Sequence, residues 1–169
     1  MFTIAHLSLN TVERQQAIQV VAHIEALVQE QDAWTYQALA ELLEQDSIDM
    51  LIVYEQAPSA AIIDNEVLGY CLYQVVFEQA EILRIGTHPD YQRQGIASQI
   101  FARLTTELQA KSVESLLLEV RADNTPAIAL YEQQAFTVIH KRKGYYHLLG
   151  QPAVDALIMQ RVYAQGEGN

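Results

Sequence analysis

The sequence predicts a mixed α/β fold, in which a central sheet carries helices on its faces. Stretches with apolar residues at helical spacing are separated by shorter stretches of β-branched and aromatic residues. The chain has 169 residues, and 50% of them are hydrophobic, which is enough for one domain with a sizeable core. We therefore expect a single domain over residues 1–164 and a disordered tail over residues 165–169.

The first half of the chain predicts a short strand, two helices and then a series of strands. In the first helix, Val20, Ile24 and Leu27 recur at helical spacing. The last strand is a long aromatic and β-branched segment, preceded by a turn at Asp64 and Asn65. The expected elements are a strand over 2–6, helices over 12–27 and 36–44, and strands over 50–54, 60–63 and 67–77.

In the second half of the chain, strands alternate with helices. The clearest helix contains Ile100, Leu104 and Leu108, which belong to one apolar stripe. A later helix is predicted to begin with Thr125 as its cap and Pro126 in its first position. The expected elements are a strand over 82–87, a helix over 95–110, a strand over 116–120, a helix over 125–133, and strands over 137–140 and 156–162.

Acidic residues are concentrated in the first half of the chain. Residues 1–83 carry 13 acidic side chains and one basic side chain, whereas residues 84–169 carry eight acidic and nine basic ones. Phosphate backbones bind clustered Lys and Arg, so this distribution argues against a nucleic-acid partner. An acidic surface attracts cationic ligands, such as an amine or a basic peptide. Acidity that merely serves solubility explains the same imbalance.

Several absences favour a cytoplasmic protein without a metal. The longest uncharged apolar run, residues 67–77, is shorter than the roughly 20 residues of a membrane span. The first residues lack the basic and apolar regions of an export signal. Cys71 is the only cysteine, and the five histidines show no paired ligand spacing. The sequence also lacks a Walker loop and a Gly-x-Gly-x-x-Gly motif, which disfavours a dinucleotide-binding fold.

A glycine-containing loop lies between a predicted strand and the helix that follows it. The first amide groups of a helix have no partner within the helix, so they can bind an anionic phosphate. Gly95 lets the backbone approach a ligand closely, and Arg93 adds a charge-assisted contact. The alternative is an ordinary strand–helix turn that needs glycine for its dihedral angles. The loop consists of Gln92, Arg93, Gln94, Gly95, Ile96 and Ala97.

Two segments resemble the motifs of the GNAT acetyltransferase family. Residues 85–97, IGTHPDYQRQGIA, resemble its central motif, in which Arg/Gln-x-x-Gly-x-Gly/Ala follows a strand. Residues 118–132, LEVRADNTPAIALYE, resemble its second motif. Together with the later Tyr145-Tyr146, they are similar to the RimI branch, which acetylates the N-terminal alanine of a small-subunit ribosomal protein. The similarity extends from about Glu81 to Tyr146 and is loose in the first half of the chain.

The resemblance implies a fold, a co-substrate and a set of residue roles. The fold would be a mostly antiparallel sheet of about six to seven strands, splayed at its central strand, and the co-substrate acetyl-CoA. Residues 92–97 would cradle the pyrophosphate, and Asn124 would contact the pantetheine arm. Glu119 matches the general base, and Tyr131 matches the general acid beside the cofactor. The strand that holds the acetyl and pantetheine part would contain Ile85, Gly86 and Thr87.

Amide formation is compatible with these assignments. The attacking amine must lose a proton, the carbonyl must be polarised, and the departing thiolate should receive a proton. Glu119 is the one ionisable group in an apolar run, and partial burial would suit it as a base; pairing with Arg121 is the alternative. Tyr131 would equally serve as core packing. Glu81, at the start of the central strand, is the rival base.

The acceptor side of the site is less defined by the sequence. Trp34, Tyr145 and Tyr146 are candidates for contacts with the acceptor, although Trp34 would also fit a core and the tyrosines the end of a strand. Ala135 replaces the usual family glycine, so a positive φ there would carry strain. A small amine, an antibiotic or a lysine side chain is the alternative acceptor. A non-catalytic module that binds acyl-CoA or a partner protein is the alternative from another functional class.

Overall fold

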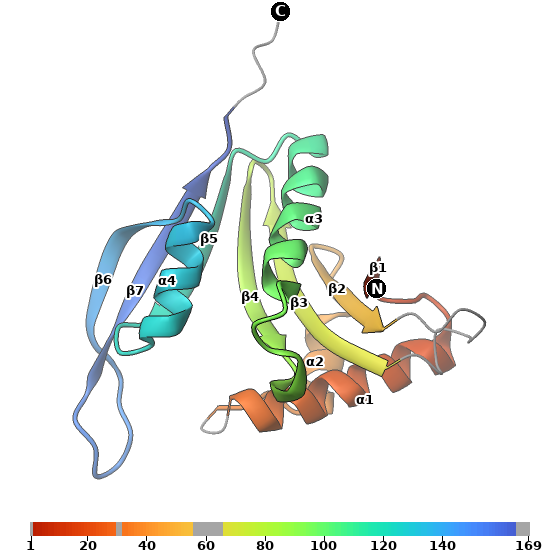
Figure 1. Cartoon of the computed structure of the whole chain (residues 1–169), viewed down its shortest axis with the longest axis horizontal. Helices are drawn as coiled ribbons and strands as arrows, with labels where there is room; N and C mark the ends of the chain where they lie inside the picture. The colour runs from red at the N-terminus through yellow and green to blue at the C-terminus, as the bar shows by residue number, and fades with distance from the viewer. Residues whose placement is uncertain (1, 30–31, 56–65, 165–169) are drawn as a thin grey trace, which may run out of the picture. The chain divides into compact units, whose positions relative to one another are not determined.

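The computed structural model describes residues 2–29, 32–55 and 66–164, and these form two compact units (Figure 1). The first unit comprises residues 1–74 and 84–105, and the second comprises residues 75–83 and 106–169, in both cases without the residues outside the described ranges. The prediction of one domain over 1–164 therefore stays a prediction. The expected tail, the strand over 60–63 and the turn at Asp64 and Asn65 lie outside the described residues.

The described strands form a seven-stranded sheet in the order β1-β2-β3-β4-β5-β7-β6, which confirms the predicted mixed α/β fold. The β4–β5 pair is parallel, whereas β1–β2, β2–β3, β5–β7 and β6–β7 are antiparallel. The strands are β1 (Phe2–His6), β2 (Ile48–Glu55), β3 (Glu66–Val76), β4 (Gln79–Thr87), β5 (Ser115–Arg121), β6 (Thr137–Tyr146) and β7 (Val154–Val162).

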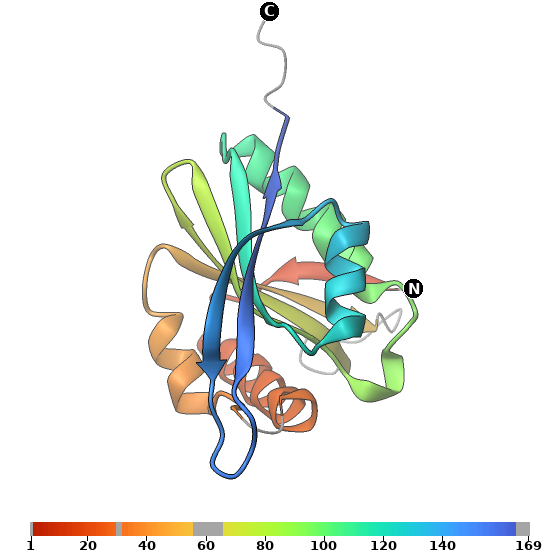
Figure 2. The same cartoon turned by 90° about the vertical axis from the view of Figure 1, so that its left-hand side faces the viewer.

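The core of the first unit surrounds β2. Four consecutive residues of this strand, Met50 to Val53, are fully buried, so side chains on both faces are covered. Figures 1 and 2 show α1 (Thr11–Val28) and α2 (Tyr36–Leu42) on one face of these strands and α3 (Ile96–Ala110) on the other. The predicted stripe of α3 is confirmed, because Ile96, Ile100, Leu104 and Leu108 are all buried.

Helix α1 buries only part of its predicted apolar spacing: Ile24 is buried as expected, whereas Val20 and Leu27 are not. Asn10 caps the helix by accepting hydrogen bonds from the amides of Val12 and Glu13. Val20 and Leu27 are 39% and 42% exposed, whereas Glu25 is fully buried. The apolar pattern could not predict this, because Glu25 is compensated by polar groups from distant strands, as described below.

The second unit is built on β5, β7 and β6, and α4 (Thr125–Gln133) lies along these strands (Figure 1). Strand β5 alternates buried and partly exposed residues, and Leu116, Leu118 and Val120 face the core. Strand β6 was predicted to end at His140 but extends to Tyr146. Strand β6 lies at the edge of the sheet, and nearly all of its residues are exposed. The residues after His140 are therefore mostly polar and lack the apolar pattern by which a strand is predicted.

The start of α4 differs by one residue from the prediction. The cap is Asn124 rather than Thr125, since Asn124 Oδ1 accepts a hydrogen bond of 3.3 Å from the Ala127 amide. Thr125 is the first residue of the helix, and Pro126 lies within its first turn. An asparagine carbonyl and a threonine hydroxyl can serve the same capping role, so the sequence alone did not decide between neighbours.

The end of α4 has the left-handed residue that glycine usually provides. Ala135 has a φ of +67°. The Phe136 amide donates to the Tyr131 carbonyl at 3.0 Å, and the Ala135 amide donates to the Glu132 carbonyl at 3.0 Å. These two bonds form a Schellman motif, so alanine has kept the geometry of a glycine position at a conformational cost.

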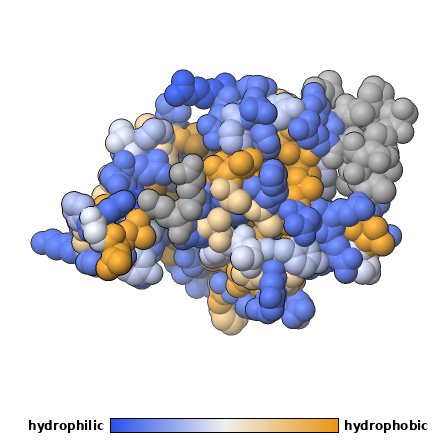
Figure 3. Space-filling view, turned by 90° about the horizontal axis from the view of Figure 1, so that it is seen from below, coloured by the Kyte–Doolittle hydropathy of each residue, from blue (hydrophilic) through white to orange (hydrophobic). Residues whose placement is uncertain are grey.

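Exposed apolar residues are scattered over the described surface. One face of the molecule, seen from below, shows hydrophobic patches separated by hydrophilic residues (Figure 3). Among the described helices, none is long and apolar enough to cross a membrane. The most exposed of the large apolar side chains are Leu9, Phe77, Val162 and Leu149.

Candidate functional site

In the first unit, the second half of β4 packs closely against β3. A Cβ added at Gly86 would lie 2.6 Å from the hydroxyl oxygen of Tyr70 and 2.8 Å from its Cζ. No side chain fits between the two strands at this point, so Gly86 lets Tyr70 approach the β4 backbone. Ile85, Gly86 and Thr87 are all partly exposed, as a backbone that receives a ligand must be.

The loop from Gln92 to Ala97 has the backbone geometry of a ligand-binding turn. Arg93 has a φ of +64° and Gly95 a φ of +81°, and α3 begins at Ile96 directly afterwards. A Cβ added at Gly95 would meet no atom within 4 Å, so glycine is favoured here by its dihedral angle rather than by space. Residues 92–95 are exposed in this unit. The loop therefore presents backbone at a helix N-terminus, an arrangement that suits an anionic group.

The parallel ladder between β4 and β5 is short. Its three pairs are Gln79–Ser115, Ala80–Leu116 and Glu81–Leu117, and all of these residues belong to the second unit. Strand β4 nevertheless continues to Thr87, and β5 continues to Arg121.

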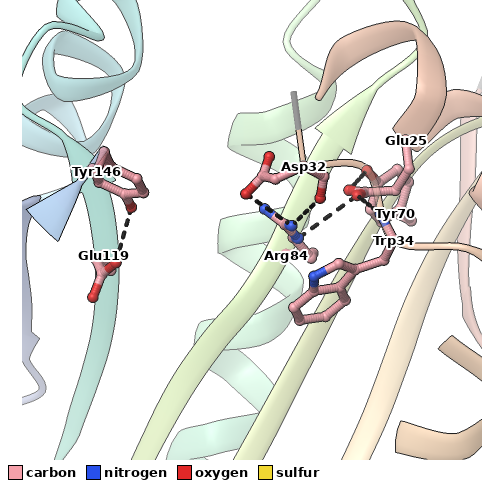
Figure 4. A network of polar contacts seen from close by, with 7 residues as sticks. All are labelled: Glu25, Asp32, Trp34, Tyr70, Arg84, Glu119 and Tyr146. Carbon is pink, nitrogen blue, oxygen red and sulfur yellow. Dashed lines mark hydrogen bonds and ion pairs between the residues drawn. The ribbon is translucent and has the colours of Figure 1, made fainter. Parts of the chain in front are cut away.

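In the second unit, Glu119 lies on β5 between two buried neighbours, Leu118 and Val120. Its side chain is 25% exposed. The hydroxyl of Tyr146 donates a hydrogen bond of 2.9 Å to Glu119 Oε1 (Figure 4). Arg142 Nη1 lies 3.8 Å from Glu119 Oε2. Glu119 is thus a partly buried carboxylate that a tyrosine holds in place.

Glu81 projects from the same face of the sheet as Glu119. It is paired with Leu117 in the register, and Leu117 and Glu119 are two residues apart on β5, so their side chains share a face. Burial and, secondarily, the negative charge of Glu119 raise the pKa of Glu81 above its usual range, while Arg142 acts in the opposite direction. Two carboxylates with this arrangement hold a proton more readily than isolated ones.

Arg121 forms a two-pronged pair with Asp123. Its Nε and Nη2 each lie 3.0 Å from a carboxylate oxygen of Asp123, and this pairing lowers the pKa of Asp123. The guanidinium also lies 5.2 Å from the centre of the Tyr146 ring. Arg121 therefore supports the ring whose hydroxyl reaches Glu119.

Tyr131 and Asn124 take part in the packing and capping of α4. Tyr131 is 9% exposed, and its ring meets Phe136 edge to face with 6.0 Å between the centroids. Asn124 caps the helix through Oδ1. Tyr131 therefore packs in the core, as the alternative interpretation expected. Its role as a general acid stays a prediction.

Trp34 belongs to a polar cluster of the first unit that sequence reasoning did not identify. Glu25 is fully buried and accepts hydrogen bonds from the Tyr70 hydroxyl and from the Trp34 amide, the latter at 3.0 Å. The Arg84 guanidinium lies 4.3 Å from the centre of the Trp34 ring and binds Asp32 (Figure 4). The one signal of this cluster in the sequence is Glu25, a glutamate on an otherwise apolar face of the predicted helix.

Tyr145 is the exposed member of the tyrosine pair. It is 53% exposed, and its ring packs edge to face on Tyr146 with 5.3 Å between the centroids. The Arg142 guanidinium lies 5.2 Å from its ring centre. Among the described residues, no three His, Cys, Asp or Glu side chains are grouped as a metal site would require.

The acetyltransferase (GNAT) family matches residues 21–136 of the chain. Over 96 residues the chain is 40% identical to the ribosomal protein bS18-alanine N-acetyltransferase of Escherichia coli, an alignment that covers 57% of this chain and 64% of that protein. The chain thus matches less than two thirds of this curated relative's length. It is also 31% identical to an N-alpha-acetyltransferase of Saccharolobus solfataricus over 127 residues, covering 68% of this chain and 74% of that protein.

Among solved structures, the chain is similar to the ribosomal-protein-S18-alanine N-acetyltransferase from Escherichia coli. The TM-score is 0.78 with 28% sequence identity, and the alignment covers 100% of this chain and 99% of that chain. The structural similarity therefore includes the first half of the chain, where the sequence resembles the family only loosely.

Proposed function

Because the chain belongs to the acetyltransferase (GNAT) family, we propose that it transfers an acetyl group from acetyl-CoA to a primary amine. The proposed acceptor is the N-terminal α-amine of a ribosomal protein, which the similarity to bS18-alanine N-acetyltransferases supports. The observation that carries the proposal is the placement of Glu119 within a family motif, partly buried and bound by Tyr146. A ribosomal acceptor implies action in the cytoplasm.

The residues present fit acetyl-CoA as co-substrate. The loop from Gln92 to Ala97 offers exposed backbone at the start of α3, and Arg93 adds a positive charge for the pyrophosphate. Ile85 to Thr87 would hold the acetyl and pantetheine part through the backbone, and their amides would polarise the carbonyl. Asn124 would contact the pantetheine arm. When bound, acetyl-CoA supplies the acetyl group as an activated thioester.

Glu119 is the proposed general base and Tyr131 the proposed general acid. In direct attack within a ternary complex, the amine loses a proton as its nitrogen bonds to the acetyl carbon, and Glu119 accepts that proton. The carbon–sulfur bond breaks, and Tyr131 gives the departing sulfur a proton. Proton exchange with solvent returns both side chains to their starting states, so the cycle balances.

Glu81 is the alternative base. Burial and the charge of Glu119 raise the pKa of Glu81, but the segment that matches the family's general base contains Glu119 and not Glu81. We therefore assign the general base to Glu119 and expect the neighbouring Glu81 to act on it through its charge. If Glu81 were the base, its removal would abolish turnover more completely than removal of Glu119.

The acceptor would contact aromatic side chains. Trp34, Tyr145 and Tyr146 are the proposed contacts, and Tyr145 is exposed enough to touch a peptide. The acidic first half of the chain favours a cationic peptide over an anionic one.

The proposed function is tested by the mass change of peptides incubated with the protein and acetyl-CoA. A peptide that begins with alanine should gain one acetyl group at its N-terminus, and the same peptide with a blocked N-terminus but a free lysine should not. Acetylation of the lysine or of small amines alone would favour the alternative acceptors. Binding of CoA without turnover of any amine would favour a non-catalytic module.

A further inference from the structure

One arginine fastens the connection between α1 and α2 to β4. Arg84 Nη2 donates a hydrogen bond of 2.7 Å to the backbone carbonyl of Asp32 and lies 3.2 Å from its carboxylate. The same guanidinium stacks over the Trp34 ring at 4.3 Å from its centre (Figure 4). Since a guanidinium is planar and rigid, these contacts fix two residues of the connection at once.

Glu25 explains why Arg84 is held in one position. Its carboxylate is fully buried, and a buried charge is tolerated only when partners compensate for the lost water. The partners are the Tyr70 hydroxyl, the Trp34 amide and the positive charge of Arg84, whose Nε lies 3.6 Å from Glu25 Oε2. Among the described residues, this Nε is buried without a hydrogen-bond partner, so its pairing with Glu25 is electrostatic. The contacts of Arg84 with Asp32 come from Nη2.

The cluster adjoins the β4 residues that the proposed function assigns to the co-substrate. Arg84 immediately precedes Ile85, and it shares a strand face with Gly86, against which Tyr70 packs. The side chain of Arg84 is 14% exposed, so it contacts the connection rather than solvent.

We propose that Arg84 is a positioning residue for the amine acceptor, which acts by holding Trp34 and Asp32 in the arrangement that the acceptor meets. This inference rests on the proposed function, which places Trp34 at the acceptor. A residue with this role sets the affinity for the acceptor and leaves the affinity for acetyl-CoA unchanged, because residues 32–34 are its targets and it does not itself touch either substrate.

The test compares Arg84→Lys with the wild type in steady-state acetylation of an alanine-initiated peptide. Lysine keeps the positive charge beside Glu25 but lacks the planar guanidinium, whose Nη2 binds Asp32 and which stacks on Trp34. We expect the KM for the peptide to rise about tenfold, which corresponds to the loss of one charge-assisted hydrogen bond. The KM for acetyl-CoA and kcat should stay within about twofold of the wild type, a margin far below that effect.

Two further variants keep the result interpretable. Asp32→Asn changes a side chain that is 61% exposed, so the fold tolerates it, and we expect a smaller rise in the KM for the peptide. Arg14→Lys is the matched control, because Arg14 Nη2 also donates to a backbone carbonyl of this unit, that of Leu43 at 3.0 Å, but has no contact with residues 32–34 among the contacts described. Arg14→Lys should leave the KM for the peptide unchanged.

Trp34 is the only tryptophan of the chain, so its fluorescence reports on the cluster directly. Peptide binding should change the emission of the wild type, and the change should be reduced in Arg84→Lys. A wild-type KM for the peptide in Arg84→Lys, or equal increases for peptide and acetyl-CoA, would overturn the inference while leaving the proposed function intact. Absence of turnover by the wild type on every amine would overturn the proposed function, and this inference with it.

Discussion

The hydroxyl of Tyr146, on β6, donates a hydrogen bond of 2.9 Å to the carboxylate of Glu119, on β5. The two residues lie on strands that are not neighbours, because β7 separates them in the sheet. The tyrosine ring is in turn supported by Arg121 at 5.2 Å. Residues of two strands therefore fix the direction in which Glu119 points, and the proposed role as general base needs a side chain that is held in this way.

Glu119→Gln should lower kcat by a factor of about 10² to 10⁴, the usual contribution of a positioned base. The amide keeps the shape of the side chain and can still interact with Tyr146, so the free energy of unfolding should change little. The measurement is peptide acetylation at saturating substrates. A variant that turns over at the wild-type rate would remove Glu119 from the mechanism.

Tyr146→Phe should reduce kcat much less than Glu119→Gln, by about tenfold, because one hydrogen bond to the carboxylate is lost while the base remains. The control is Tyr145→Phe, since no hydrogen bond of the Tyr145 hydroxyl is among the contacts described. Equal effects of the two tyrosine variants on kcat would show that the bond to Glu119 is unimportant.

Glu81→Gln should change how stability depends on pH. Burial and the charge of Glu119 raise the pKa of Glu81, so the folded protein keeps a proton that the unfolded chain releases near pH 4.3, about the ordinary value for Glu. The stability contributed by that proton is lost as the pH rises through the folded pKa. Relative to the wild type, the free energy of unfolding of Glu81→Gln should therefore increase as the pH rises above the ordinary pKa of Glu, about 4.3.

Urea denaturation at a series of pH values measures this difference. Glu119→Gln provides a second comparison. Removal of this neighbouring charge should weaken the pH dependence of the unfolding free energy that Glu81 causes. A constant stability difference between Glu81→Gln and the wild type across the series would contradict the prediction.

Ala135→Gly should stabilise the protein by about 0.5–1 kcal/mol, since alanine at φ +67° is strained and glycine is not. The greater freedom of glycine in the unfolded chain offsets part of the gain. The matched control is Ala129→Gly, in the exposed interior of α4, which should cost about 1 kcal/mol. The midpoint of urea denaturation should move in opposite directions for the two variants.

Gly86→Ala should destabilise the protein by about 1–3 kcal/mol, as overpacking usually does. The added methyl group would meet the Tyr70 hydroxyl at 2.6 Å, so β3 and β4 would have to shift. In a Tyr70→Phe background the cost of Gly86→Ala should be smaller, because the hydroxyl oxygen is gone. Additive effects in this double-mutant cycle would argue against the close contact.

Cys71 should resist thiol reagents in the folded protein. The side chain is fully buried, and burial raises the pKa of its thiol, so the reactive thiolate is disfavoured. Labelling with a chromogenic disulfide should be slow in buffer and fast in denaturant. Rapid labelling of the native protein would show that β3 opens readily.

Local patterns in the sequence were sufficient for most of the elements. The stripe of Ile100, Leu104 and Leu108 predicted α3 because the spacing of apolar residues decides which face of a helix is buried. The edge strand β6 was shortened in the prediction because its residues are exposed and polar, so they carry no alternation. Asn124 and Thr125 are both good helix caps, so the sequence could not distinguish them. The hydrogen bond from the Ala127 amide to Asn124 Oδ1 identifies Asn124 as the cap.

The sequence predicted the candidate site only as single residues, whose roles stay predictions, and not as contacts between them. The motifs indicated Glu119 and Glu81 separately, whereas their shared face follows from the register of β4 and β5. The bond from Tyr146 depends on the β6–β7 hairpin, and the burial of Glu25 depends on Tyr70 and Arg84. Such contacts join residues far apart in the chain, and periodicity holds no information about them.

Strand β7 follows every other strand along the described chain, yet it lies between β5 and β6. Strand β7 pairs with seven residues of β5, from Ser115 to Arg121. Within the described sheet, β6 pairs with β7 and with no other strand. During synthesis the half of the sheet that carries Glu119 and Tyr146 therefore stays incomplete until Val154–Val162 has left the ribosomal tunnel. We therefore expect Glu119 to gain its hydrogen bond from Tyr146 only after Val154–Val162 has been synthesised.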